Sequence, residues 1–288
     1  MIISKTPYRL PLSGGGTDID FYYKKSKGHL ISVSIDQYVY VLITPRLIDK
    51  NYLIQTTSSQ FTNKLSKIQH FLIRETLKFY GVKEKMHIGT YSTVPTRTGL
   101  GTSSAMVVGL INCINNYKGL GLSDQQIVKD AYKIERKICK AHGGWQDQII
   151  SQYGGLLDIK ISKNEKLNIK RIKIEKNIEN VIKNNFLLVY TKKKRNSSKI
   201  ILSQKKRMSN VIKYYDKIKS FNNFTLNSLR KSKIKNIGLI FNQHWKLKKS
   251  LSNQMSDQKI DSFYDNLLSN FNIFGGKLIG AGGGGFPG

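Results

Sequence analysis

With 288 residues, 39% of them hydrophobic, the chain is long enough to bury a sizeable core, which excludes disorder as its main state. It contains no run of about 18 apolar residues and no apolar leader behind Lys5 and Arg9, so we expect a cytoplasmic protein without a membrane span or signal peptide. The net charge of +30 comes from 48 basic residues, of which 39 are Lys spread from end to end. Because a specific nucleic-acid binder concentrates Arg and aromatic residues on one patch, we expect no specific nucleic-acid partner; salt-sensitive DNA or RNA binding is the alternative.

The first half of the chain shows strand and helix patterns separated by glycine-rich breaks. The break at 13–18 ends at Asp18, a residue typical of a helix N-cap. Residues 30–44 alternate apolar and polar side chains in two phases, which favours two strands joined by a turn. The predicted elements are a strand over 1–12, a helix over 19–25, the strand pair over 30–44, a helix over 65–80, a strand over 86–94, and helices over 105–117 and 123–141.

The pattern of apolar and polar residues changes near residue 156, after Gly154-Gly155. Weak alternation follows, and then a compact apolar segment and a series of amphipathic helices. We place a domain boundary near residue 160. The predicted elements are strand-like alternation over 157–174, a strand over 186–191, helices within 198–252, and a strand over 275–281 that enters a glycine run.

The segment 95–104 joins the predicted strand at 86–94 to the apolar helix after it. Gly99 and Gly101 allow a tight turn and a close backbone approach to a ligand, and the first amides of the helix point toward the same place. The hydroxyls of Thr102, Ser103 and Ser104 add further donors, so the segment predicts an anion site. It is not a Walker loop, since no lysine follows the second glycine. Plain helix capping is the alternative for this segment taken alone.

Glu135 and Asp147 stand out among the 18 acidic residues. A phosphoryl-transfer enzyme needs one carboxylate to receive the proton of the acceptor hydroxyl and an oxygen ligand for Mg²⁺. None of the positions three and four residues from Glu135 is a lysine, so its carboxylate faces apolar neighbours and needs a partner or an ion. Asp147 follows the Gly143-Gly144 break, and a helix cap is the alternative role for it.

Two further segments are rich in glycine. One has charged residues at both ends, and the other is a glycine run near the end of the sequence. Arg9 precedes the glycine turn that ends in Asp18; the guanidinium can neutralise developing charge, and the carboxylate can accept hydrogen bonds from a polyol. Gly280 to Gly285 formally satisfies G-x-G-x-x-G, but a dinucleotide fold needs that motif early in a βαβ unit, before a helix.

Taken together, the order and content of these segments resemble the GHMP sugar kinases. The resemblance rests on Thr6-Pro7-Tyr8-Arg9 with Gly14-Gly15-Gly16-Thr17-Asp18, on Pro95 with Gly99-Leu100-Gly101-Thr102-Ser103-Ser104, and on Lys277-Leu278-Ile279-Gly280-Ala281 with Gly282 to Gly285. Within that family, Ser34-Ile35-Asp36-Gln37, Gln146-Asp147-Gln148 and Trp245-x-Leu247-Lys248 resemble the D-glycero-α-D-manno-heptose 7-phosphate kinases.

The resemblance implies an α+β, two-domain GHMP kinase fold. Its N-terminal, ATP-binding domain would be ribosomal S5-like and span 1–160, and its C-terminal domain would be ferredoxin-like, span 161–288 and be cut short at its end. The implied cofactors are ATP and Mg²⁺, and the implied reaction is phosphorylation of the anomeric hydroxyl of a heptose 7-phosphate. A kinase for a fucose-like hexose and a non-catalytic sugar- and ATP-binding relative are the alternatives.

The resemblance also implies residue roles. Asp147 would be the base, with Arg9 beside it, and Ser103 and Glu135 would be the Mg²⁺ ligands. The phosphates of ATP would lie on Pro95, Gly99, Leu100, Gly101, Thr102, Ser103 and Ser104. The sugar would contact Gly15, Gly16, Thr17, Asp18, Gly282, Gly283 and Gly284.

Overall fold

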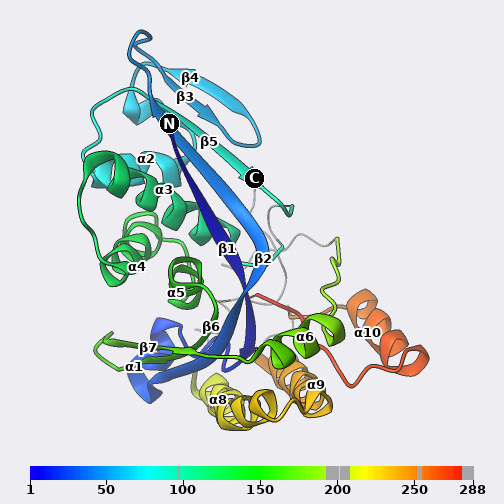
Figure 1. Ribbon diagram of the computed structural model, residues 1–288. Coiled ribbons are helices and arrows are strands. Elements are labelled where there is room, and N and C mark those ends of the chain that lie inside the picture. Colours follow the sequence, from blue (N-terminus) through cyan, green and yellow to red (C-terminus); the bar gives the residue numbers. More distant parts are fainter. Residues whose placement is uncertain (96–97, 193–200, 202–207, 252–254, 281–288) are drawn as a thin grey trace.

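The computed structural model describes residues 1–95, 98–192, 201, 208–251 and 255–280 (Figure 1). In this part of the chain, helices pack around one mixed sheet of seven strands in the order β4-β3-β5-β2-β6-β7, with β1 paired to β2. The strands are β1 (Ile2–Ser13), β2 (Gly28–Pro45), β3 (Tyr52–Gln55), β4 (Ser59–Thr62), β5 (Met86–Ser92), β6 (Leu156–Ile161) and β7 (Leu167–Ile172).

Strand β2 organises the sheet. One of its edges pairs with β1 from Ile43 to Ile31, and the other is shared by β5, over 39–45, and β6, over 28–33. All three partners are antiparallel to β2. The long strand therefore joins an upper part of the sheet, made with β5, to a lower part, made with β6 (Figure 1).

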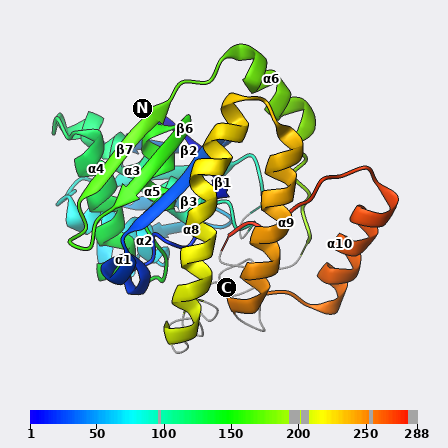
Figure 2. The same ribbon diagram turned by 90° about the horizontal axis from the view of Figure 1, so that it is seen from below.

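The helices lie on both faces of this frame. They are α1 (Asp20–Ser26), α2 (Phe71–Phe79), α3 (Thr102–Lys118), α4 (Asp124–Tyr132), a π-helix (Lys133–Ile138), α5 (Gln146–Tyr153), α6 (Lys176–Asn185), α8 (Met208–Arg230), α9 (Ile234–Leu251) and α10 (Gln258–Asn270), with a 3₁₀ turn at Leu65–Lys67. Figure 2 shows α8 and α9 side by side along the lower sheet, with α10 farther out.

Alternation along β2 explains how the lower sheet is covered on both sides. Leu30 packs with Trp145 and Ile149 of the α5 segment, whereas its neighbour Ile31 packs with Phe241 of α9. Burial of these apolar side chains provides the main free energy that holds the helices onto the sheet. The cleft described below lies where the two helical layers meet the end of β1.

Several predicted elements differ from the observed ones. Residues 30–44 are not two strands, because β2 runs through them without a turn. The phase change falls where the pairing with β1 jumps from Pro7↔Tyr38 to Arg9↔Ser34; a β-bulge changes the phase of a strand without ending it. The predicted helix over 65–80 is split, because its α-helical part starts only at Phe71, where the His70 side chain accepts from the amide of Ile73.

The strand predictions in the second half were mostly wrong. Residues 157–174 do form a hairpin, β6 and β7. Residues 186–191, in contrast, form no strand, and Leu187 is 88% exposed. Residues 275–279 have no regular structure either. Neither segment pairs with another strand in the described part of the chain, and an apolar run without a hydrogen-bonded partner does not become a strand.

The division of the chain at residue 160 stays a prediction, as do the named domain types. The sheet itself continues past that point, since β7 pairs with β6 along its whole length. None of the helices in the described part of the chain is long and apolar enough to cross a membrane.

Candidate functional site

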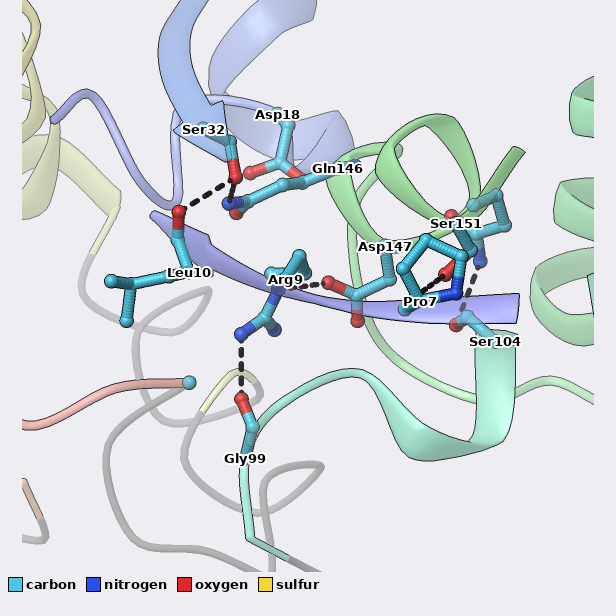
Figure 3. Close-up of polar contacts among 12 residues, drawn as sticks. Pro7, Arg9, Leu10, Asp18, Ser32, Gly99, Ser104, Gln146, Asp147 and Ser151 are labelled. Atoms are coloured by element: carbon cyan, nitrogen blue, oxygen red, sulfur yellow. Dashed lines mark hydrogen bonds and ion pairs between the residues drawn. The ribbon is translucent and has the colours of Figure 1, made fainter. Parts of the chain in front are cut away.

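Two segments that are far apart in the sequence meet at the Arg9 side chain (Figure 3). Its Nε donates to Oδ1 of Asp147 at 2.6 Å, and its Nη1 donates to the carbonyl of Gly99 at 2.6 Å. The Arg9 side chain is 8% exposed and that of Asp147 is 22% exposed. A charge-assisted pair with little solvent around it is stronger than a surface ion pair. Arg9 thus connects β1, the first turn of α5 and the 98–104 loop.

The loop itself is shaped by its glycines. Gly101 has φ +83°, and a Cβ there would lie 3.1 Å from Cγ of Asp147. Gly99 has φ +78°, and a Cβ there would lie 2.9 Å from the carbonyl of Ile279. Only glycine combines this backbone conformation with such close neighbours at little cost. The loop is therefore held between Asp147 on one side and residues 279–280 of the C-terminal segment on the other.

Asp18 lies on the same cleft and is 5% exposed. Its Oδ2 accepts from the backbone amide of Gln146 at 3.0 Å, and the Gln146 side chain donates to Ser32 at 2.8 Å. Burial raises the pKa of the Asp18 carboxyl, and the charge of Asp147 adds to that effect. The predicted N-cap role of Asp18 is wrong, because Ile19 occupies the N-cap of α1 without a side-chain cap. The carboxyl points instead at the start of α5.

Glu135 lies in the π-helix that follows α4 and is 1% exposed. Its Oε2 accepts from the Gln148 side chain, which also bonds Ser104 at 3.2 Å. Arg136 Nη1 lies 3.8 Å from Oε1 of Glu135. Burial raises the pKa of the Glu135 carboxyl, whereas the positive charge of Arg136 opposes that rise. The buried carboxylate agrees with the expectation from the sequence, and the wide π-turn directs the acid into the cleft, as such turns often do at functional sites.

The cleft brings together most of the site residues predicted from the sequence. Those that line it are Arg9, Gly15, Gly16, Asp18, Gly99, Gly101, Thr102, Ser103, Ser104, Glu135 and Asp147.

Three others lie off it. Leu100 is buried in the main core, the Thr17 hydroxyl bonds the carbonyls of Gly14 and His29, and Pro95 is exposed. Gly282, Gly283 and Gly284 lie outside the described residues.

Sequence reasoning assigned no role to the basic side of the cleft. Lys248 of α9, Lys277 and His244 all line it. Lys248 Nζ donates to the carbonyls of Leu278, at 3.0 Å, and Gly280. Burial lowers the pKa of Lys248 to about 7, with the charge of Arg9 acting in the same direction. Both lysines belong to segments on which the family resemblance rests, but lysines are frequent everywhere in this chain, so nothing in the sequence indicates that these two are buried.

Comparison with known proteins fits this geometry. Residues 63–155 match the family model for the GHMP kinases N terminal domain. D-glycero-alpha-D-manno-heptose 7-phosphate kinase of Campylobacter jejuni is 28% identical over 99% of this chain and 88% of its own length. The chain belongs to the GHMP kinase family. It is therefore an ATP-dependent phosphotransferase that acts on an alcohol acceptor.

Two more distant relatives extend this picture. The L-fucokinase/L-fucose-1-P guanylyltransferase of Bacteroides fragilis is 23% identical over 99% of this chain and 34% of its own length. The fold of this GHMP kinase matches the crystal structure of a D-glycero-D-manno-heptose 1-phosphate kinase from Bacteroides thetaiotaomicron with a TM-score of 0.80, at 24% identity, over 98% of this chain and 86% of the other. The mixed α+β fold predicted from the sequence is thus confirmed over nearly the whole chain.

The pKa of Lys248 predicts how its replacement changes stability with pH. Because this pKa is about 7 in the folded protein and about 10.4 in an unfolded chain, the folded state binds fewer protons between these values. The stability contributed at this position therefore falls as the pH is lowered through that window. We expect the free energy of unfolding of Lys248→Met, minus that of the wild type, to rise toward neutral pH by at most about 1.4 kcal/mol per pH unit.

Urea unfolding at a series of pH values between about 6 and 10 measures this difference. Lys246→Met changes an exposed lysine on the same helix and is expected to show no such trend. A pH-independent difference for Lys248→Met would contradict the account of its burial.

Proposed function

We propose that this GHMP kinase transfers the γ-phosphoryl group of ATP to the anomeric hydroxyl of a heptose 7-phosphate, which gives the 1,7-bisphosphate. The relative from Campylobacter jejuni, which aligns over 99% of this chain, supports the choice of acceptor. The observation that supports the chemistry most directly is the Arg9–Asp147 pair at the mouth of the 98–104 loop, bonded at 2.6 Å.

Asp147 is the residue we assign as the base. Arg9 holds its Oδ1, while no described residue forms a hydrogen bond with its Oδ2. An oxygen that is free on the cleft side can take the proton of the acceptor hydroxyl as the new O–P bond forms and the bond to ADP breaks. Arg9 fixes the direction of the carboxylate and offsets negative charge near the transferred group.

The hydroxyls and amides at the start of α3 are the donors we assign to the phosphates of ATP. Thr102, Ser103 and Ser104 begin this helix and line the cleft. A helix N-terminus favours an anion because its first amides have no partner within the helix. On the acceptor side, Asp18 with Gly15 and Gly16 faces the same space, where a carboxylate can accept hydrogen bonds from sugar hydroxyls.

Ser103 and Glu135 fit a Mg²⁺ site in their donor chemistry, since hydroxyl and carboxylate oxygens are the ligands this ion prefers. Both line the cleft, and the buried Glu135 carboxylate gains from a cation near it. The described residues form no cluster of three or more His, Cys, Asp or Glu side chains, so phosphates and water would complete the ligand set. Bound Mg²⁺ would neutralise charge on the phosphates during transfer.

A kinase for a fucose-like hexose is the second candidate. The alignment with the Bacteroides fragilis fucokinase over 99% of this chain favours it. The two candidates share the donor side and differ in whether the acceptor already has a phosphate group. A non-catalytic relative is less consistent with the cleft, because Asp147, Glu135 and Ser103 all line it together.

Replacement of Asp147 tests the assignment of the base. We expect Asp147→Asn to lower kcat with heptose 7-phosphate by about 10² to 10⁴-fold, the usual contribution of general-base assistance. Binding of ATP measured by calorimetry should change only slightly, since the amide has the same shape. Asp124→Asn, at an exposed position on α4, is the control. A full rate for Asp147→Asn would refute the role, and turnover of only an unphosphorylated hexose would refute the acceptor.

Replacement of Glu135 tests the metal assignment. Glu135→Gln removes the charge but keeps the size of the side chain, so we expect the Mg²⁺ concentration for half-maximal activity to rise by about 10-fold or more. Glu179→Gln, at a residue exposed beside Lys183 on α6, serves as the control. An unchanged Mg²⁺ requirement in Glu135→Gln would show that the ion is held elsewhere.

A further inference from the structure

Two lysines from different segments lie on the same wall of the cleft. Lys248 comes from the last turn of α9, and Lys277 from the segment that follows α10. Lys277 Nζ donates to the carbonyl of Leu12 at 2.7 Å and lies 4.2 Å from the ring centroid of Phe241. Both ammonium groups are thus fixed by packing and hydrogen bonds, unlike the many lysines on the surface.

Neither lysine contacts a carboxylate in the described part of the chain. The partners of Lys248 are the carbonyls of Leu278 and Gly280, and those of Lys277 are the carbonyl of Leu12 and Nδ1 of His244, at 3.3 Å. Burial and the charge of Lys277 keep the pKa of His244 well below its usual value. The imidazole is therefore neutral and accepts a hydrogen bond from Lys277, so every one of these partners is uncharged.

Among the residues that the structure describes, each ammonium group has a donor to spare. A protonated lysine has three N–H bonds, and the contacts above use two on each side chain. Two partly buried cations without an opposite charge are costly. Burial lowers the pKa of both lysines. An anion bound in the cleft beside them would raise these pKa values again and accept hydrogen bonds from the spare N–H groups. The arrangement is that of a binding site for an anionic group.

The position of Lys277 indicates which ligand brings the anion. Lys277 is bonded to the end of β1 through Leu12, and the His244 ring lies against the turn of Gly15, where a Cβ would be 4.0 Å from its Cε1. This is the turn that leads to Asp18, on the acceptor side of the cleft. The donors assigned to ATP come instead from the start of α3.

We propose that Lys248 and Lys277 bind a phosphate group that the acceptor already has before the reaction. The pair would then determine specificity, because a free sugar leaves both cations unpaired while a sugar phosphate neutralises them. The inference rests on the proposed kinase function for the identity of the acceptor. The recognition itself needs only a sugar phosphate as ligand.

The test uses two single variants of the full chain, Lys277→Gln and Lys248→Gln. A third variant, Lys246→Gln, changes an exposed lysine of α9 and is the control. The substrates are heptose 7-phosphate and the same heptose without phosphate. We expect each cleft variant to lower kcat/KM for heptose 7-phosphate by about 10- to 100-fold, as is usual for the loss of a hydrogen bond to a charged group. Turnover of the free heptose and the KM for ATP should stay within about 3-fold of the wild type.

Other outcomes would overturn the proposal. An equal loss with both sugars would mean that the lysines only support the fold, and a large rise in the KM for ATP would assign them to the nucleotide. Should a glutamine variant fail to fold, Lys277→Arg and Lys248→Arg provide the test, because a retained cation has to retain the preference for the sugar phosphate.

Calorimetry with heptose 7-phosphate, mannose 6-phosphate and the free sugars, without ATP, separates this proposal from the proposed function. If the wild type binds a sugar phosphate in a way that Lys277→Gln abolishes, yet does not phosphorylate heptose 7-phosphate, the proposed function fails and the lysine site stands. If the wild type phosphorylates heptose 7-phosphate and both variants keep its affinity, the lysine site fails and the function stands.

Discussion

The whole cleft depends on one buried cation, the guanidinium of Arg9. It lies near the middle of the long β1–β2 pair and bonds both Asp147 and the carbonyl of Gly99, each at 2.6 Å. These residues lie 138 and 90 positions away along the chain. A guanidinium has several donors in one rigid plane, so it can fix a carboxylate and a loop carbonyl at the same time. The planar geometry fixes both the direction of Asp147 and the position of the loop.

The cleft gathers charges that a stable core would avoid. Glu135 and Asp18 are almost fully buried, and Lys248 and Lys277 line the same cleft. Burial raises the pKa of both acids and lowers the pKa of both lysines. Each shift shows a charged form that the protein alone stabilises poorly. A ligand with phosphates, a cation and hydroxyls would provide partners for both the acids and the lysines. Binding sites often contain such groups, which lower the stability of the free protein but are needed for function.

The sequence allowed the loop at the start of α3 to be placed on the cleft better than the basic residues that line it. Gly99, Gly101 and the hydroxyl residues after them form a local motif, and the structure places them together at the start of α3. The spacing around Glu135 correctly indicated a buried acid. Its π-turn was not predictable, because the apolar period of a helix hardly changes when one turn widens. The burial of Lys248 and Lys277 was not predictable either, although both lie in motifs of the family resemblance, since it arises only from the packing of α9 against the segment 275–280.

The errors in the fold have related causes. The bulge in β2 resembled a turn because local alternation cannot distinguish a phase shift from a chain reversal. Residues 186–191 had the composition of a strand, yet whether a strand forms depends on a partner that is remote in the sequence. In both cases tertiary pairing, and not local propensity, decided the structure.

The coupling between Arg9 and Asp147 is the most direct measure of the central claim. We would compare kcat/KM for Arg9→Met, Asp147→Asn and the double variant with that of the wild type in a double-mutant cycle. If the pair acts as one unit, kcat/KM of the double variant should be no more than about 10-fold below that of the less active single variant. The loss in the double variant would then be much smaller than the product of the two single losses. Losses that multiply in the double variant would contradict the account, because they would mean that the two residues act independently.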